Sequence, residues 1–223
     1  MFDAEAARLR EILLGQQAVS PLLNLGSSTR AFRESAKPHI QSALFGPLAA
    51  AGVAVVHSDL KEADGVDVAG DILDPAVLAG LKTRGFKCVL VANLLEHVRD
   101  PAGVAAACEE IVGPGGLILA TVPSSFPYHA DPIDTGFRPA AAELARLFGR
   151  SELLLAEEIA GRTYAEDFKA RGSTLWREIG GTLLFALLAV VRPKSFAARV
   201  HRWRWYRRPY KVSIALVRVA PSG

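Results

Sequence analysis

The sequence has 223 residues, of which 50% are apolar and 22% are charged, a balance typical of a folded globular chain and not of a disordered one. Its net charge of +3 is unevenly distributed, because residues 192–211 carry eight Lys or Arg and no acid, which leaves the rest of the chain at −5. The two cysteines, Cys88 and Cys108, show no CxxC and no metal-ligand spacing, so we expect buried thiols in a reducing compartment and no metal site.

In chain order, the pattern predicts alternating helices and strands. Residues 3–17 read as an amphipathic helix, and their acidic start gives no sign of a secretion signal. Further helices are expected at 40–52 (interrupted near Gly46-Pro47), 73–85, 100–113 and 139–149, with Asp74 as an N-cap and the same Asp-Pro device at Asp100. Strands are expected at 21–26, 53–59, 65–71, from 86 onward, 115–123, within 151–161, and at 210–220.

The strands are nearly continuous apolar runs, which favours a mainly parallel sheet that is buried on both faces. We therefore expect an α/β fold of three layers with a Rossmann-like sheet. Such sheets bind ligands beyond the carboxyl ends of their strands. The stretch "LLNLGSSTR" (22–30) ends one strand in a glycine and two serines, and Asp59 and Asp71 end the next two.

Asp59 and Asp71 carry acceptor groups that match the donors of a nucleoside. A carboxylate at Asp59 can accept two hydrogen bonds from a ribose diol, and Asp71 can accept one from an adenine amino group. Strand-end aspartates also cap turns, which is the alternative role for each. A nicotinamide-dependent dehydrogenase is disfavoured, because no GxGxxG follows the first strand.

The block 91–123 carries the most specific pattern in the chain. It contains "LLEHVRDP" (94–101), "GPGG" (113–116) and "TVP" (121–123), and the glycines of the turn supply positive φ angles. With Gly70-Asp71 and Asp59, this block resembles the class I S-adenosylmethionine (SAM)-dependent methyltransferases, in the broad type 11-like branch with an "LEHV.DP…PGG…VP" signature.

The resemblance implies a seven-stranded sheet with an antiparallel last strand, and SAM lying over the carboxyl ends of the first three strands. Gly26, Ser27 and Ser28 would then approach the methionine part, Asp59 would bind the ribose, and Asp71 with Ile72 the adenine. Asn93 and Leu94 would line the pocket near the sulfonium, and His97 would pack near the cofactor or orient the neighbouring loop. The remaining implied cofactor-site position is Asn24.

Two features depart from the family pattern. The family's first motif has an acid followed by Gly-x-Gly, whereas this chain has Asn24-Leu25-Gly26-Ser27-Ser28. Asn24 lacks the negative charge that an acid at this position would carry, whereas the small side chains of Ser27 and Ser28 would allow the backbone of the loop to approach the cofactor. In addition, few residues separate the second and third strands, so the usual helix between them is shortened or absent.

The loop 124–141 follows the fifth strand and holds four polar candidates for catalysis. His129 is the candidate general base for a hydroxyl acceptor, because neutral imidazole accepts a proton near pH 7. Asp131 or Asp134 would orient it, and Arg138 would hold an acidic or sugar substrate. The alternative is a rigid loop in which Asp and Arg pair structurally.

Residues 164–209 are the least typical of the family. "IGGTLLFALLAVV" (179–191) is too short to span a membrane, and it precedes a basic segment rich in aromatic residues. This combination suits a membrane surface or a lipid-linked substrate through 179–211, but also core packing, a homodimer or a nucleic-acid-binding patch.

These observations predict an N-terminal helix (1–20), a methyltransferase-like core (21–163 and 210–220) and an insertion (164–209). We expect a cytoplasmic enzyme that transfers a methyl group from SAM to a small acceptor such as a sugar or lipid-linked glycan hydroxyl, with contact to a membrane surface as one of the open alternatives for 179–211. A nucleic-acid methyltransferase and a catalytically inactive scaffold subunit of the same fold are the alternatives.

Overall fold

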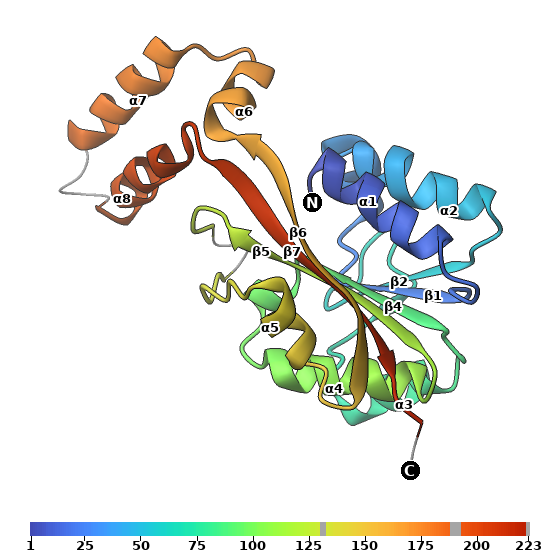
Figure 1. The fold of residues 1–223 in the computed structure, drawn as a ribbon. Helices are drawn as coiled ribbons and strands as arrows, with labels where there is room; N and C mark the ends of the chain where they lie inside the picture. Colours follow the sequence, from blue (N-terminus) through green and yellow to red (C-terminus); the bar gives the residue numbers. More distant parts are fainter. Residues whose placement is uncertain (130–132, 188–192, 222–223) are drawn as a thin grey trace.

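The computed structural model describes residues 1–129, 133–187 and 193–221, and its centre is one seven-stranded sheet in the order β3-β2-β1-β4-β5-β7-β6 (Figure 1). The strands are β1 (Leu22–Leu25), β2 (Val55–Asp59), β3 (Val68–Ala69), β4 (Cys88–Ala92), β5 (Leu117–Ser125), β6 (Ser151–Thr163) and β7 (Pro209–Val219). The first five are parallel, and β7 runs antiparallel to both β5 and β6. The predicted mainly parallel sheet with an antiparallel last strand is confirmed.

Helices cover both faces of the sheet, which gives the three predicted layers (Figure 1). One face packs against α1 (Asp3–Leu14) and α2 (Gly46–Ala50), and the other against α3 (Pro75–Lys82), α4 (Pro101–Val112) and α5 (Ala141–Arg146). Every residue of β1 is buried, so the strand reads as a continuous apolar run apart from Asn24. Cys88 and Cys108 are buried free thiols, as predicted, and burial raises the pKa of both.

The two predicted Asp-Pro helix starts are confirmed in detail. Asp74 accepts the N–H groups of Ala76 and Val77 at the start of α3, and Asp100 accepts that of Gly103 at the start of α4. Each aspartate precedes a proline at the first helical position, where the missing N–H costs nothing. The Gly113–Gly116 turn has positive φ at Gly113 (64°) and Gly115 (78°).

Several observed elements are shorter than predicted, and three differences have a structural reason. The third strand is much shorter than 65–71, because only Val68 and Ala69 pair with β2. The helix predicted at 40–52 contains a π-helical turn over Gln41–Phe45 before α2, where Pro47 lacks the N–H of a regular ladder. The first helix ends at Leu14, three residues early, with Gly15 as its C-cap. The predicted lack of a helix between β2 and β3 is confirmed.

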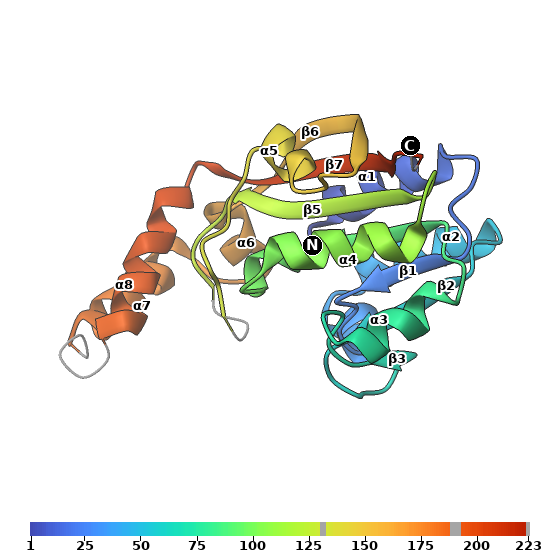
Figure 2. The same ribbon diagram turned by 90° about the horizontal axis from the view of Figure 1, so that it is seen from below.

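The described residues 164–187 and 193–205 contain helices that extend the molecule away from the sheet. Figure 2 shows α7 (Leu175–Leu187) and α8 (Pro193–Arg202) projecting beyond the end of β5, next to α6 (Tyr164–Ala170). An aromatic cluster anchors them to the core: Tyr164, Phe168, Trp205 and Tyr210 are buried together, and the Trp205 indole donates to Ser125 Oγ at 3.0 Å. Residues 188–191 of the predicted apolar run lie outside the described residues. Within the described chain, no helix has the length and apolarity that crossing a membrane requires.

Candidate functional site

The loop after β1 is a tight turn between two neighbouring strand ends. Gly26 has φ +72°, and a Cβ at this position would lie 2.9 Å from Leu94 Cδ1, so both conformation and space require glycine. The N–H groups of Gly26 and Ser27 both donate to the Ser58 carbonyl at 2.9 Å. The structure thus brings the candidates Gly26 and Leu94 into contact at the carboxyl edge of the sheet.

A buried arginine fixes this loop from behind. Arg33 donates from Nη1 to the carbonyls of Ser27 (3.0 Å) and Ser28 (2.7 Å), and from Nη2 to that of Gly65 (2.8 Å). Burial lowers the pKa of Arg33, because removing a guanidinium from water disfavours its charged form. The three carbonyls offset that cost, and the loop is consequently pre-formed without a second glycine.

Asp59 is part of the same turn. Its Oδ2 accepts the Ser28 N–H at 2.7 Å, and Ser28 has φ +54°. Its Oδ1 has only a long contact, at 3.4 Å, with the Lys61 N–H. Since an ionised carboxylate offers about four acceptor positions, Asp59 can still accept hydrogen bonds from a diol while it holds the loop.

Asn24 stands where the family's first motif has an acidic residue, and its side chain has a partner on the adjacent strand. Its Nδ2 lies 3.0 Å from His57 Nδ1, on the adjacent strand β2. Burial, followed by the charge of Arg33, lowers the pKa of His57 to about 4, so the imidazole is neutral at pH 7. The neutral ring accepts from the Asn24 amide, and the Asn24–His57 pair itself carries no net charge.

Asp71 and Ile72 lie at the end of β3 and behave differently from Asp59. Asp71 is exposed, and its Oδ1 accepts the Leu73 N–H at 2.9 Å, which is a turn-capping contact. Ile72 is buried in the core below this turn. The short β3 therefore places Asp71 in an open position, where it retains acceptor capacity.

Asn93 connects the candidate cofactor edge to the N-terminal helix. It has φ +52°, and its Nδ2 donates to Glu5 Oε1 at 2.7 Å. Glu5 is fully buried, and the same oxygen also accepts from Thr121 Oγ1 at 2.7 Å, while its Oε2 accepts the Phe2 N–H at 3.1 Å. Glu5 thus joins α1 to the ends of β4 and β5.

His97 follows Asn93 and Leu94 in the 3-10 turn Leu95–His97. Its Nδ1 bonds to the carbonyl of Ile133, which ties this turn to the loop after β5. Its neighbour Glu96 is fully buried, and both carboxylate oxygens are without a hydrogen-bond partner among the described residues. Burial raises the pKa of Glu96 to about 7.

The loop after β5 brings three of its four candidates together. Asp134 Oδ2 lies 3.4 Å from His129 Nδ1 and accepts the His129 N–H at 2.9 Å. Arg138 Nη2 donates to the same oxygen at 2.6 Å. Arg138 is thus paired with Asp134, and Asp131 lies outside the described residues. Burial, with the charges of His97 and Arg138, lowers the pKa of His129.

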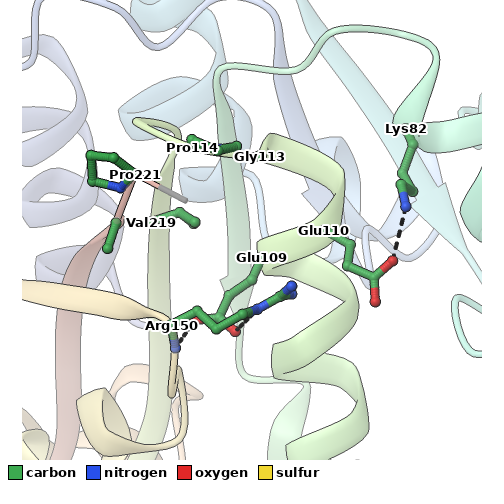
Figure 3. Close-up of a pocket in the computed structure, with 9 residues that line it drawn as sticks. Lys82, Glu109, Glu110, Gly113, Pro114, Arg150, Val219 and Pro221 are labelled. Carbon is green, nitrogen blue, oxygen red and sulfur yellow. Dashed lines mark hydrogen bonds and ion pairs between the residues drawn. The ribbon is translucent and has the colours of Figure 1, made fainter. Parts of the chain in front are cut away.

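A cavity lies at the opposite edge of the sheet from these residues. It encloses about 530 Å³ beside the amino end of β5 and is lined by residues that include Gly113, Pro114 and Val219 (Figure 3). Its charged side chains pair with one another, Lys82 with Glu110 at 2.9 Å and Arg150 with Glu109 at 3.2 Å. Its charges are paired, and the carboxyl ends of the parallel strands lie at the other edge of the sheet, so this cavity is a poor cofactor site.

Sequence reasoning gave no role to four residues that shape the site: Glu5, Arg33, His57 and Glu96. Two of them carry a signal in the sequence. Glu5 shares a helical stripe with Leu9 and Ile12, where a carboxylate is out of place, and Glu96 lies in the block "LLEHVRDP" (94–101) after a strand. Arg33 and His57 have no such local signal. Their roles follow from contacts with residues of other elements.

Comparison with known proteins supports the fold. No family model matches the chain, and no curated protein matches its sequence. Among solved structures, the 4+2 cyclase SpnF is similar with a TM-score of 0.57 at 16% identity, over 99% of this chain and 82% of SpnF. A SAM-dependent methyltransferase from Archaeoglobus fulgidus is similar with a TM-score of 0.54 at 11% identity, over 97% and 93% of the two chains.

Coclaurine N-methyltransferase, bound to N-methylheliamine and S-adenosylhomocysteine (SAH), gives a TM-score of 0.50 at 14% identity, over 97% of this chain and 70% of its own. At these identities the likeness shows the fold and no more, and the presence of a cyclase beside methyltransferases agrees with that limit. The chain has the Rossmann-like fold of class I methyltransferases.

Proposed function

We propose that the protein is a SAM-dependent methyltransferase acting on a small acceptor. The observation that carries this proposal is the contact of the Gly26 turn with Leu94, beside a strand-end carboxylate at Asp59 that retains free acceptor positions. These groups lie at the carboxyl ends of β1, β2 and β4, where open α/β sheets bind nucleotides. Two of the structurally similar proteins are methyltransferases.

In this proposal, each cofactor-site residue has a role that its surroundings support. Gly26, Ser27 and Ser28 contact the methionine part, Asp59 binds the ribose hydroxyls, and Asp71 with Ile72 borders the adenine. Asn93 and Leu94 line the region of the sulfonium, and Asn24 supports the loop through His57. The remaining neighbour is His97, which holds the two loops together through Ile133.

The acceptor side of the proposed site is the loop after β5. His129 is the proposed general base, because its pKa is lowered, so the ring is neutral at pH 7, and Asp134 orients its Nδ1. Arg138 is committed to Asp134, so we assign it to positioning the loop and not to binding an acidic substrate. A sugar or lipid-linked glycan hydroxyl is the acceptor class we propose, within a cytoplasmic enzyme.

The outer face of α7 supports a contact with a membrane surface. Trp176, Leu183 and Leu184 recur at helical spacing and are 79%, 64% and 59% exposed, and the basic segment 192–211 lies next in the chain. Apolar side chains with adjacent cations suit an anionic lipid surface. Replacing all three apolar residues with serine should abolish flotation with anionic liposomes. If the triple serine variant floats with liposomes to the same extent as the parent, the proposal is contradicted. It is also contradicted if the parent chain self-associates through α7 and does not bind liposomes.

Calorimetric titration of the full chain with SAM and SAH tests the proposed function. We expect binding of both, and Asp59→Ala should weaken it by about 1–3 kcal/mol, since the ribose donors lose their partner. His129→Ala should lower turnover but preserve SAH affinity. If neither SAM nor SAH binds at high micromolar concentration, the enzyme proposal fails and the inactive scaffold becomes the better account. Retention of RNA at low salt would instead favour a nucleic-acid methyltransferase.

A further inference from the structure

Three potential metal ligands meet beyond the neighbouring carboxyl ends of β4 and β5. A carboxylate oxygen of Glu96 and ring nitrogens of His97 and His129 all lie within 4.8 Å of one another. His97 Nε2 is 3.7 Å from Glu96 Oε1, and the two imidazole rings are perpendicular with centroids 5.0 Å apart. Glu96 and His97 lie in the Leu95–His97 turn, and His129 lies in the loop after β5. Ile133 and Thr135 of that loop hydrogen-bond to the turn, which holds the two segments together.

Glu96 is the reason to suspect a ligand here. The side chain is fully buried, yet neither oxygen has a hydrogen-bond partner among the described residues. Leaving a buried carboxylate unpaired is costly, so such groups are normally bonded, paired with a charge or bound to a metal. The Arg138 guanidinium, which could have paired with Glu96, instead donates to Asp134 and to the carbonyl of Phe137.

Both histidines are held in the form that binds metals. His97 Nδ1 donates to the Ile133 carbonyl, which leaves the lone pair of Nε2 free. His129 Nδ1 is 3.4 Å from both the Pro127 carbonyl and Asp134 Oδ2, two acceptors that place the proton on Nδ1. A ligating histidine usually donates its other N–H to a carbonyl or carboxylate in this way, which orients the ring and raises its basicity.

We propose that Glu96, His97 and His129 bind one divalent transition-metal cation of the zinc class, with a coordination position left open. Two imidazoles and one carboxylate suit zinc, whereas magnesium prefers oxygen ligands alone. Ligand atoms around a tetrahedral zinc are about 3.3–3.4 Å apart, from bonds of about 2.0–2.1 Å. The observed 3.7 Å between His97 and Glu96 is near this value, and side-chain movements of about 1 Å complete the site.

The site goes beyond the proposed methyltransferase function and does not require it. His129 belongs to the loop proposed to receive the acceptor, so an open coordination position beside it would suit a water molecule or an acceptor oxygen. With the cation bound, His129 is a ligand and no longer a free base. The sequence pattern did not predict this site, because it has none of the spacings by which sequential metal motifs are recognised.

Equilibrium dialysis of the tag-free full chain against buffered Zn²⁺, without SAM, tests the proposal. We expect one Zn²⁺ per chain, at least a hundredfold preference over Mg²⁺, and at least tenfold weaker binding in Glu96→Gln and His129→Ala. His201→Ala is the matched control, because His201 is the histidine of α8, outside the cluster, and it should bind as the parent does. Visible absorption of Co²⁺ in the same site should show tetrahedral coordination in the parent and lose it in both variants.

Two results would overturn the proposal. One is a parent chain that binds no Zn²⁺ at micromolar concentration, and the other is Glu96→Gln and His129→Ala binding as tightly as His201→Ala. Misfolding does not confuse this test, because Glu96→Gln removes a buried, unpaired carboxylate and should leave the metal-free melting temperature unchanged or higher. SAH titration of the same variant separates the two proposals: retained SAH binding with lost Zn²⁺ binding supports the metal site, whereas loss of both indicates a structural role for Glu96 and contradicts it.

Discussion

Replacing Glu5 with alanine should destabilise the protein by much more than its position on an N-terminal helix suggests. The carboxylate is fully buried and accepts three hydrogen bonds, from Asn93 Nδ2 and Thr121 Oγ1 at 2.7 Å and from the Phe2 N–H at 3.1 Å. The alanine variant leaves these donors without their partner in a site that water does not reach. Glu5 Oε2 also lies 3.9 Å from the buried ammonium group of Met1. Each stranded hydrogen-bonding group costs about 1–3 kcal/mol, and breaking a buried charged pair costs about 3–5 kcal/mol, so we expect a loss of about 3–5 kcal/mol.

The assay is urea unfolding at pH 7, with Glu11→Ala as the matched control. Glu11 lies on the same helix but is exposed, and it pairs with Arg8 at 3.2 Å on the surface, so its replacement should change the free energy of unfolding by less than about 0.5 kcal/mol. Because Glu5 also positions Asn93, the Glu5 variant should bind SAH more weakly at temperatures where it remains folded. A Glu5 variant no less stable than the Glu11 variant would refute the reasoning.

Two further predictions concern the loop after β1. Arg33→Leu leaves the carbonyls of Ser27, Ser28 and Gly65 without their donor and should weaken SAH binding about tenfold. The matched control is Arg30→Leu, at an exposed arginine, which should not change the affinity. If the two variants bind SAH equally well, the loop does not need Arg33. Because the pKa of His57 falls from 6.5 to about 4 on folding, the unfolded chain binds the proton first as pH drops. The parent should therefore lose up to about 3 kcal/mol of stability between pH 6.5 and pH 4 relative to His57→Gln, as measured by urea unfolding at each pH; parallel losses would contradict the neutral Asn24–His57 pair.

The strand-and-helix pattern was readable from the sequence because the sheet is parallel and buried. Strands such as "CVLVA" are apolar on both faces, and the Asp-Pro starts at Asp74 and Asp100 have a local mechanism that operates as predicted. Boundaries were less predictable where tertiary contacts decide them. The strand expected at 65–71 shrinks to Val68–Ala69, because pairing with β2 is confined to two residues.

The candidate site was predictable where one residue acts at one strand end, as Asp59 and Gly26 do. It was not predictable where the role comes from elements distant in sequence. Glu5 meets Asn93 across 88 positions, and Asn24 meets His57 across 33. The sequence left two roles open for Arg138, substrate binding and structural pairing with an aspartate. Only the side-chain geometry shows that Arg138 pairs with Asp134.

Amide hydrogen exchange of the full chain with and without saturating SAH locates the bound ligand on the sheet. We expect slower exchange at the carboxyl edge of the sheet, in the segments 26–28, 59–61, 71–73 and 93–97. We expect no change around Gly113 and Val219, which line the cavity at the opposite edge. Protection at that cavity, or none at 26–28 and 59–61, would contradict the proposed cofactor site.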